Sequence, residues 1–139
     1  MLHWTIAQCN VWGIRMKIYK HVDKTLVVWE QEYKKGFTAY MILYFLNTND
    51  MYGYEIKNKL ENFTSSDLQF QESGIYKNLK KLKIKNYVKS EIRSSDKGPN
   101  RKYYTITESG RNLLKTFTEE IIYPVSKSIV NLIENDRKE

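Results

Sequence analysis

Apolar residues recur every three to four positions in three stretches of the first 85 residues, which predicts three helices. These stretches are residues 24–47, 51–61 and 71–85. In the first, residues 37–46 are apolar on nearly all sides, which favours a buried central helix, and Gly36 is a potential break before them. The first three elements are therefore expected to be helices that pack around one core.

The hydrophobic period then shortens from helical spacing to alternation, which indicates strands. Residues 87–93 and 101–106 alternate loosely, and the residues between them, SSDKGPN at 94–100, are rich in turn formers. This predicts one β-hairpin with a seven-residue loop. Asn86, just before it, suits the left-handed conformation that ends a helix, and the polar residues at 47–50 are expected to form a turn that caps the second helix.

A last helix follows the hairpin. Thr107 is placed to cap it, Gly110 is expected to be a weak point in its first turn, and Pro124 predicts a kink or break near residues 120–124. Its apolar face is long for the small domain before it, so we expect dimerisation through this face, with folding back on its own domain as the alternative. The expected interface residues are Leu114, Phe117, Ile121, Ile122, Val125, Ile129 and Ile133.

Three helices, a hairpin and a long helix follow the plan of a winged helix-turn-helix, in which the third helix enters the DNA major groove. The predicted fold is mainly α with one β-hairpin: a winged helix-turn-helix plus a C-terminal dimerisation helix. We expect residues 1–20 to be an N-terminal arm of unassigned role. Residues 21–107 are expected to be the winged helix domain, and residues 108–139 the dimerisation helix.

The net charge of +7 is concentrated in one segment. Residues 72–102 hold ten basic and three acidic residues, an excess of seven that equals the net charge of the whole chain. A basic patch on a neutral body is expected for a protein that binds a polyanion, most often nucleic acid. A solvated lysine-rich face, enriched by an AT-rich genome, is the plainer explanation of the same charge.

The third predicted helix separates its cations from its core residues. At about 100° per residue, Ile75, Leu79 and Leu82 form one stripe, and the positions opposite that stripe are Ser73, Lys77, Lys80 and Lys81. No acidic residue occurs between Tyr76 and Ser90, whereas ordinary surface helices mix Glu with Lys. This pattern favours nucleic acid over a generic solvated face.

Three motifs resemble the PadR family of bacterial transcriptional regulators. The first is GYEI at 53–56, the second is SGIYKNLKKL at 73–82, and the third and most specific is GPNRKYYTITESG at 98–110. The second motif has one residue fewer than the family pattern and carries Lys77 where proline is usual, and Asn86 replaces a usual glycine. Residues 1–20 have no counterpart in the family. MarR-type regulators share the plan but lack the RKYY sequence.

The resemblance implies a homodimer that binds double-stranded DNA, most simply as a repressor. It places Tyr54 near a phosphate, with a role as a core aromatic as the alternative, and it allows a small aromatic effector near Trp29, where plain interface packing is favoured. Of Arg101 and Lys102, which alternate along a strand, one is expected to pair internally. The candidate DNA-binding residues are Tyr54, Ser73, Tyr76, Lys77, Lys80, Lys81, Lys97, Arg101 and Lys102, and Trp29 joins the expected dimer interface.

Other functions find little support in the composition. Cys9 is the single cysteine, and His3 and His21 are the two histidines, so neither a disulfide framework nor a metal or catalytic constellation is expected, and no cofactor is implied. No apolar run approaches the roughly 20 residues of a membrane span, and a cytoplasmic location is the simplest expectation. The alternative function is a winged helix that binds protein or RNA without an operator.

Overall fold

The computed structural model describes residues 24–63 and 72–138. The expected N-terminal arm therefore lies outside the described residues, as does most of the segment between the second and third helices. The chain divides into two units between Lys35 and Gly36, within one continuous helix, α2 (Lys24–Thr48). The expected break at Gly36 does not occur, because the helix runs through that residue.

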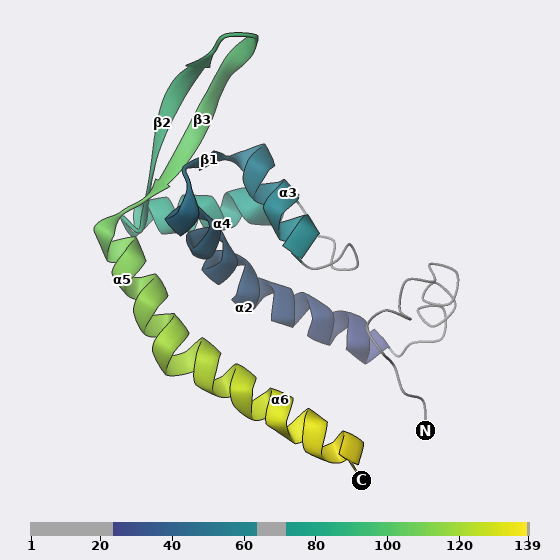
Figure 1. The fold of residues 1–139 in the computed structure, drawn as a ribbon. Coiled ribbons are helices and arrows are strands. Elements are labelled where there is room, and N and C mark those ends of the chain that lie inside the picture. Colours follow the sequence, from purple (N-terminus) through teal and green to yellow (C-terminus); the bar gives the residue numbers. More distant parts are fainter. Residues whose placement is uncertain (1–23, 64–71, 139) are drawn as a thin grey trace. The chain divides into compact units, whose positions relative to one another are not determined.

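Within the second unit, residues from four helices and a small sheet form one core (Figure 1). The end of α2 is followed by α3 (Gly53–Phe63) and α4 (Glu72–Ile84). As predicted, these helices bury apolar residues at helical spacing. The side chains that are fully buried and largest are Ile42, Ile56, Leu60, Ile75, Leu79 and Val88.

The sheet has three strands, where the sequence predicted two. The short strand β1 (Met51–Tyr52) precedes α3 and pairs antiparallel with β3 (Gly98–Ile106), which in turn pairs with β2 (Val88–Ser95). The second helix therefore begins at Gly53, two residues later than predicted. The expected cap from residues 47–50 is wrong: Glu55 instead reaches back and accepts a hydrogen bond from the Tyr52 N–H at 3.1 Å.

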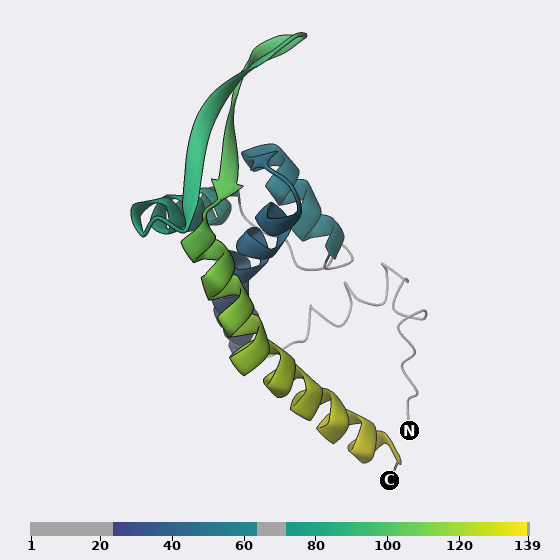
Figure 2. The ribbon, with the colours of Figure 1, turned by 60° about the vertical axis from the view of Figure 1, so that its left-hand side comes forward.

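The hairpin is also tighter than predicted (Figure 2). Ser95 pairs with Gly98, so the turn consists of Asp96 and Lys97 rather than seven residues, and a bulge lies between Arg93 and Ser95. The outer part of the hairpin is exposed on both faces, so its residues carry no alternation of apolar and polar positions that would mark them as strands.

The end of α4 is joined to the start of the next helix by several hydrogen bonds. Asn86 has a φ of 61°, and the N–H groups of Asn86 and Tyr87 bond to the carbonyls of Lys83 and Leu82, which is the Schellman pattern. Thr107 caps α5 (Glu108–Phe117) through a 3.1 Å bond from the Gly110 N–H. The left-handed Asn86 and the Thr107 cap are both confirmed.

Gly110 is a packing requirement rather than a weak point. A Cβ atom there would lie 2.8 Å from Cγ1 of Ile106 and closer still to the carbonyl oxygen of Tyr87. That oxygen is held by the Thr107 N–H at 3.1 Å, so it is not free to move. The absence of a side chain at Gly110 therefore allows α5 to pack directly on the turn that follows α4.

The predicted break at Pro124 takes the form of a π-helical turn. After α5 the chain continues as η2 (Thr118–Ile122) and then α6 (Tyr123–Lys138), with the Tyr123 N–H bonded to the carbonyl of Thr118. Proline has no N–H and its ring would clash with the carbonyl four residues back in a regular helix, which the wider turn avoids. Figure 1 shows the change of direction between α5 and α6.

Candidate nucleic-acid interface

Helix α4 has one buried and one exposed face, as its sequence predicts. Ile75, Leu79 and Leu82 are buried in the core. The side chains on the opposite face are all exposed: Ser73, Tyr76, Lys77, Lys80 and Lys81. The fold thus presents every predicted α4 contact residue to solvent on one helix surface.

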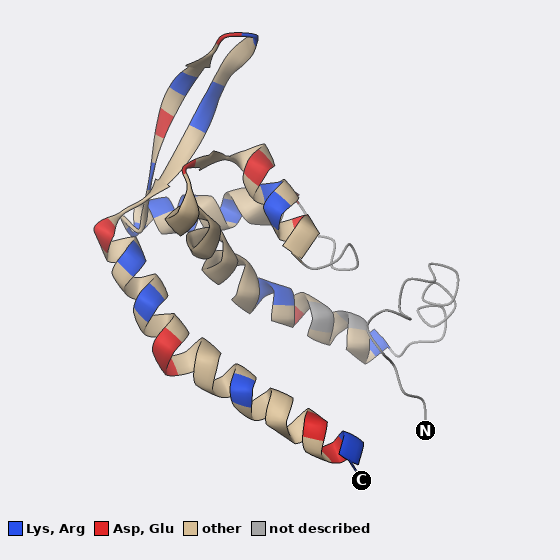
Figure 3. Ribbon diagram, viewed as in Figure 1, with Lys and Arg blue, Asp and Glu red and all other residues tan. Residues whose placement is uncertain are grey.

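In the part of the chain that the structure describes, the cations of this surface have no acidic partner. Among residues 24–63 and 72–138, no ion pair involves Lys77, Lys80 or Lys81. Figure 3 shows basic segments along α4 and along both strands of the hairpin. Unpaired, exposed lysines on one helix face are available to bind the phosphates of a nucleic acid.

Tyr76 fixes α4 against the start of α3. A Cβ atom on Gly53 would lie 2.7 Å from Cε1 and 2.8 Å from Cζ of the Tyr76 ring, so the ring lies directly on the glycine backbone. The side chain remains 43% exposed. Burial raises the pKa of the neighbouring Tyr104 hydroxyl, and interaction with Tyr76 raises it further. Tyr76 therefore packs with its hydroxyl end against the start of α3, while part of its side chain stays exposed beside the lysines of α4.

The hairpin forms the wing, which we define as residues 91–103. Lys97, at its tip, and Arg101 and Lys102, on β3, are all exposed. Arg101 is the residue that pairs internally: its guanidinium carbon lies 4.5 Å from the centre of the Tyr52 ring. Lys102 has no ion pair among the described residues.

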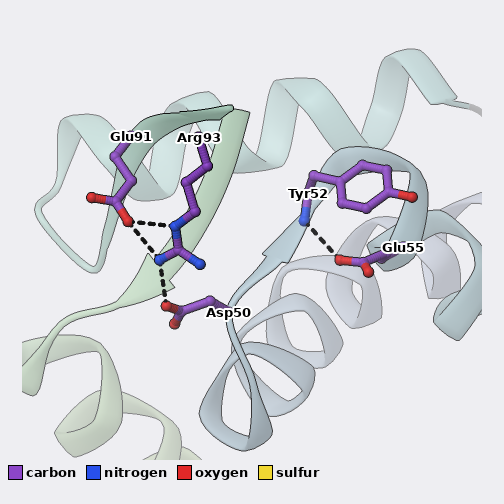
Figure 4. A network of polar contacts seen from close by, with 5 residues as sticks. All are labelled: Asp50, Tyr52, Glu55, Glu91 and Arg93. Carbon is purple, nitrogen blue, oxygen red and sulfur yellow. Dashed lines mark hydrogen bonds and ion pairs between the residues drawn. The ribbon is translucent and has the colours of Figure 1, made fainter. Parts of the chain in front are cut away.

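A polar network at the base of the wing was not anticipated from the sequence (Figure 4). Arg93 bonds to Asp50 at 2.8 Å and to Glu91 at 2.6 Å, and these bonds raise the pKa of its guanidinium above the usual range. The Arg93 guanidinium carbon also lies 4.5 Å from the centre of the Tyr103 ring. Arg93 is one of the ten basic residues of the charged segment, but in the structure its guanidinium binds acidic and aromatic side chains of the protein itself.

Tyr54 does not face the core, which argues against its alternative role as a core aromatic. Its side chain is 57% exposed and stacks on Tyr52 with the ring centres 6.5 Å apart. The phenol points outward because Tyr54 lies about 200° around the helix from Ile56, which fills the core side together with Leu60. Its exposure is compatible with the phosphate contact that the family resemblance implies.

Most of the expected dimer face is exposed. Leu114 is only 6% exposed and packs in the core of its own domain, so little of its side chain is left for contact with a partner. Phe117 contacts the ring of Tyr40, and Tyr40 also hydrogen-bonds Thr118 at 2.8 Å. Ile122 is half-buried. The remaining expected residues are exposed: Ile121, Val125, Ile129 and Ile133. In the N-terminal unit, Trp29 is 70% exposed.

The described part of the chain offers little for other chemistry. It contains no group of three or more His, Cys, Asp or Glu side chains that could hold a metal ion. No helix within residues 24–63 or 72–138 is long and apolar enough to cross a membrane. The exposed basic surface of α4 and the wing is therefore the feature of this structure that most clearly suggests a function.

The helices, the three-stranded sheet and the projecting basic hairpin define a winged helix-turn-helix protein. The family model of the transcriptional regulator PadR-like family matches residues 42–116, more than half of the chain. The chain therefore belongs to the PadR-like family of transcriptional regulators, and it is a regulator rather than an enzyme. The resemblance drawn from its three motifs is confirmed.

Known structures and sequences agree with this assignment. A PadR-like transcriptional regulator from Bacillus cereus is 30% identical, with a TM-score of 0.65 over 73% of this chain and 96% of that one. Bacillus subtilis PadR, solved in complex with operator DNA, is 26% identical, with a TM-score of 0.52 over 58% of this chain and 45% of that one. An uncharacterised protein from Lysinibacillus sphaericus is 30% identical over 70% of this chain and 88% of its own.

Proposed function

We propose that this protein is a homodimeric, sequence-specific DNA-binding regulator that represses transcription by occupying an operator. Helix α4 would enter the major groove, and the wing would contact the adjoining backbone. The observation that carries the proposal is the outer face of α4, where Ser73, Tyr76, Lys77, Lys80 and Lys81 are exposed together. An excess of unpaired cations opposite a buried stripe is typical of a recognition helix.

The wing supports the same mode of binding. Lys97 and Lys102 are exposed cations that no described acidic side chain pairs with. The structural relative from Bacillus subtilis was solved with operator DNA, which makes duplex DNA the natural partner for the corresponding surface here. A winged helix that binds protein would more naturally present apolar or mixed charge on α4.

The homodimer would form through the C-terminal helix. Residues 119–138 expose apolar side chains along η2 and α6, among them Val125, Ile129, Leu132 and Ile133. Burying such a face on a second copy removes apolar surface from water at roughly 25 cal/mol per Å². In this proposal residues 21–107 form the DNA-binding domain and residues 108–139 the dimerisation helix.

A two-fold dimer makes a geometric prediction about the operator. Its two recognition helices would contact half-sites about one helical turn apart, ~34–36 Å. Two copies of the basic surface would also make binding strongly dependent on salt, since each phosphate contact lowers log K by about 0.9 per unit of log salt concentration.

Selection from a pool of random 30-base-pair duplexes tests the proposal. The full-length protein should enrich a pseudo-palindromic sequence, and that sequence placed over a promoter should lower reporter expression when the protein is present. Binding of all duplexes with equal affinity, or of none, would contradict sequence-specific operator recognition. Enrichment with increased reporter expression would retain DNA binding but refute repression.

A further inference from the structure

The outer face of the sheet carries alternating aromatic and arginine side chains. The strand register places Tyr52 opposite Tyr103, and Arg93 opposite Arg101. Tyr52 and Tyr103 meet edge to face with ring centres 5.6 Å apart, and each ring has one guanidinium 4.5 Å from its centre. Glu91, opposite Tyr103, lies on the same face. The two arginines, which would repel each other as a directly opposed pair, are thus each held by a partner.

One ion pair ties this face to the body of the domain. Asp50 lies in the link between α2 and β1, 43 residues before Arg93, and its carboxylate is 2.8 Å from the Arg93 guanidinium. Figure 4 shows Arg93 reaching from the hairpin toward both Glu91 and Asp50. A long-range pair of this kind constrains the hairpin relative to the helices, which a pair within the hairpin cannot do.

Backbone pairing alone leaves the outer wing unsupported. Strand β1 pairs with only two residues of β3, Tyr103 and Tyr104. Beyond them no further strand within residues 24–63 or 72–138 pairs with the hairpin, and the polar tip at Asp96 and Lys97 is exposed. The side chains of Arg93 and Arg101 lie just beyond β1 and contact Asp50 and Tyr52, so they extend the support of the wing outward from its base.

We propose that Asp50, Tyr52, Arg93 and Arg101 are positioning residues that hold the wing at a fixed angle to α4, so that both surfaces meet the same DNA duplex. This inference rests on the proposed function. When two contact regions bind one ligand, fixing one relative to the other raises the effective concentration of the second contact without adding any new one. Arg101 then acts mainly through Tyr52, whereas Lys97 and Lys102 supply the wing's direct phosphate contacts.

Neutralising Asp50 distinguishes two roles of this residue, because they predict opposite changes in the affinity for DNA. An acidic residue near DNA repels phosphate, so Asp50→Asn should strengthen binding if Asp50 is only a surface charge. If Asp50 positions the wing, Asp50→Asn should weaken binding by roughly two- to fivefold, which corresponds to the loss of one exposed ion pair. The matched control is Asp96→Asn at the wing tip, which removes the same charge and should leave binding unchanged or tighter.

Binding is measured by fluorescence anisotropy with the duplex selected by the wild-type protein, at several salt concentrations. The expected result is weaker binding by Asp50→Asn than by Asp96→Asn with no flattening of the salt dependence, because no phosphate contact is lost. Tyr52→Phe, which keeps the ring under Arg101, should bind like wild type, and Tyr52→Ala should bind more weakly. Binding by Asp50→Asn as tight as that by Asp96→Asn would overturn the proposal.

A measurement without DNA separates this inference from the proposed function. Backbone ¹⁵N–¹H heteronuclear NOE values should fall for residues 93–101 in Asp50→Asn and stay at wild-type values in Asp96→Asn, while those of α4 stay constant in both. Unchanged values in Asp50→Asn would refute positioning of the wing even if the protein binds its operator. Lower values in a protein that selects no DNA would uphold the support of the wing and refute only its use in DNA binding.

Discussion

Replacing Gly110 by alanine tests whether the start of α5 is locked onto the end of α4. By helix propensity alone the substitution should stabilise the protein, because alanine is favoured over glycine within a helix by about 0.8–1 kcal/mol. The structure predicts the opposite sign. The new Cβ would stand 2.8 Å from Cγ1 of Ile106 and 3.1 Å from the carbonyl carbon of Tyr87.

The size of the loss in stability depends on whether the groups that the new Cβ meets can move away. A clash with a flexible side chain is relieved cheaply, but the Tyr87 carbonyl is backbone and is bonded to the Thr107 N–H at 3.1 Å. Overpacking of this kind typically costs about 1–3 kcal/mol, occasionally more. Because this clash is with backbone, we expect a cost at the upper end of that range, about 3 kcal/mol. After the gain in helix propensity, Gly110→Ala should lower the free energy of unfolding by about 2 kcal/mol and Tm by roughly 6–10 °C for a chain of this size.

Gly36→Ala is the matched control, since a Cβ at Gly36 in the interior of α2 would have no heavy atom within 4 Å. It should raise the free energy of unfolding by about 0.5–1 kcal/mol. Both variants and the wild type are compared by urea and thermal unfolding, followed by circular dichroism at one protein concentration. If Gly110→Ala is as stable as the wild type or more stable, Gly110 is not required for the close packing of α5 on the turn after α4.

Three further predictions concern the same junction and the C-terminal helix. Asn86→Val should cost about 1–2 kcal/mol because a β-branched residue is disfavoured at a φ of 61°, whereas Asn86→Gly should be neutral or stabilising; equal melting of the two would contradict this. Thr107→Ala should cost about 1–2 kcal/mol by removing the hydroxyl that caps Gly110 and bonds the Asn86 carbonyl, and Thr107→Ser should restore most of it in urea unfolding. Ile129→Glu should convert the dimer to monomer in light scattering at tens of micromolar, with Lys127→Glu as the control that stays dimeric; a monomeric wild type would refute the proposed interface.

The sequence predicts best those parts whose pattern repeats along a single element. The stripe of Ile75, Leu79 and Leu82 defines both faces of α4, because helical geometry alone fixes which residues share a side. Asn86 and Thr107 were recognised because caps depend on local backbone chemistry. The break before Pro124 follows from a missing N–H, although whether it forms a kink or a π turn is decided by the packing around it.

The features that the sequence did not predict depend on pairing across long separations. Strand β1 has two residues, too few for any period, and it exists because β3 offers Tyr103 and Tyr104 as partners. The ion pair between Asp50 and Arg93 joins residues 43 positions apart, so no local pattern indicates it. The sequence predicts a weak point at Gly110, but the structure shows that a glycine is required there. The requirement comes from close packing against Tyr87 and Ile106, and no local sequence pattern indicates such packing.

The most direct test of the account is the salt dependence of binding to the selected duplex after removal of two lysines from α4. Lys77→Ala/Lys80→Ala removes up to four phosphate contacts per dimer, so the slope of log K against log salt concentration should flatten by roughly two to four units. Arg137→Ala/Lys138→Ala removes the same charge from the end of α6 and should leave the slope unchanged. Flattening confined to the α4 variant, with unchanged circular dichroism and Tm, is the predicted result. Wild-type affinity and slope in the folded α4 variant would show that this helix does not contact DNA.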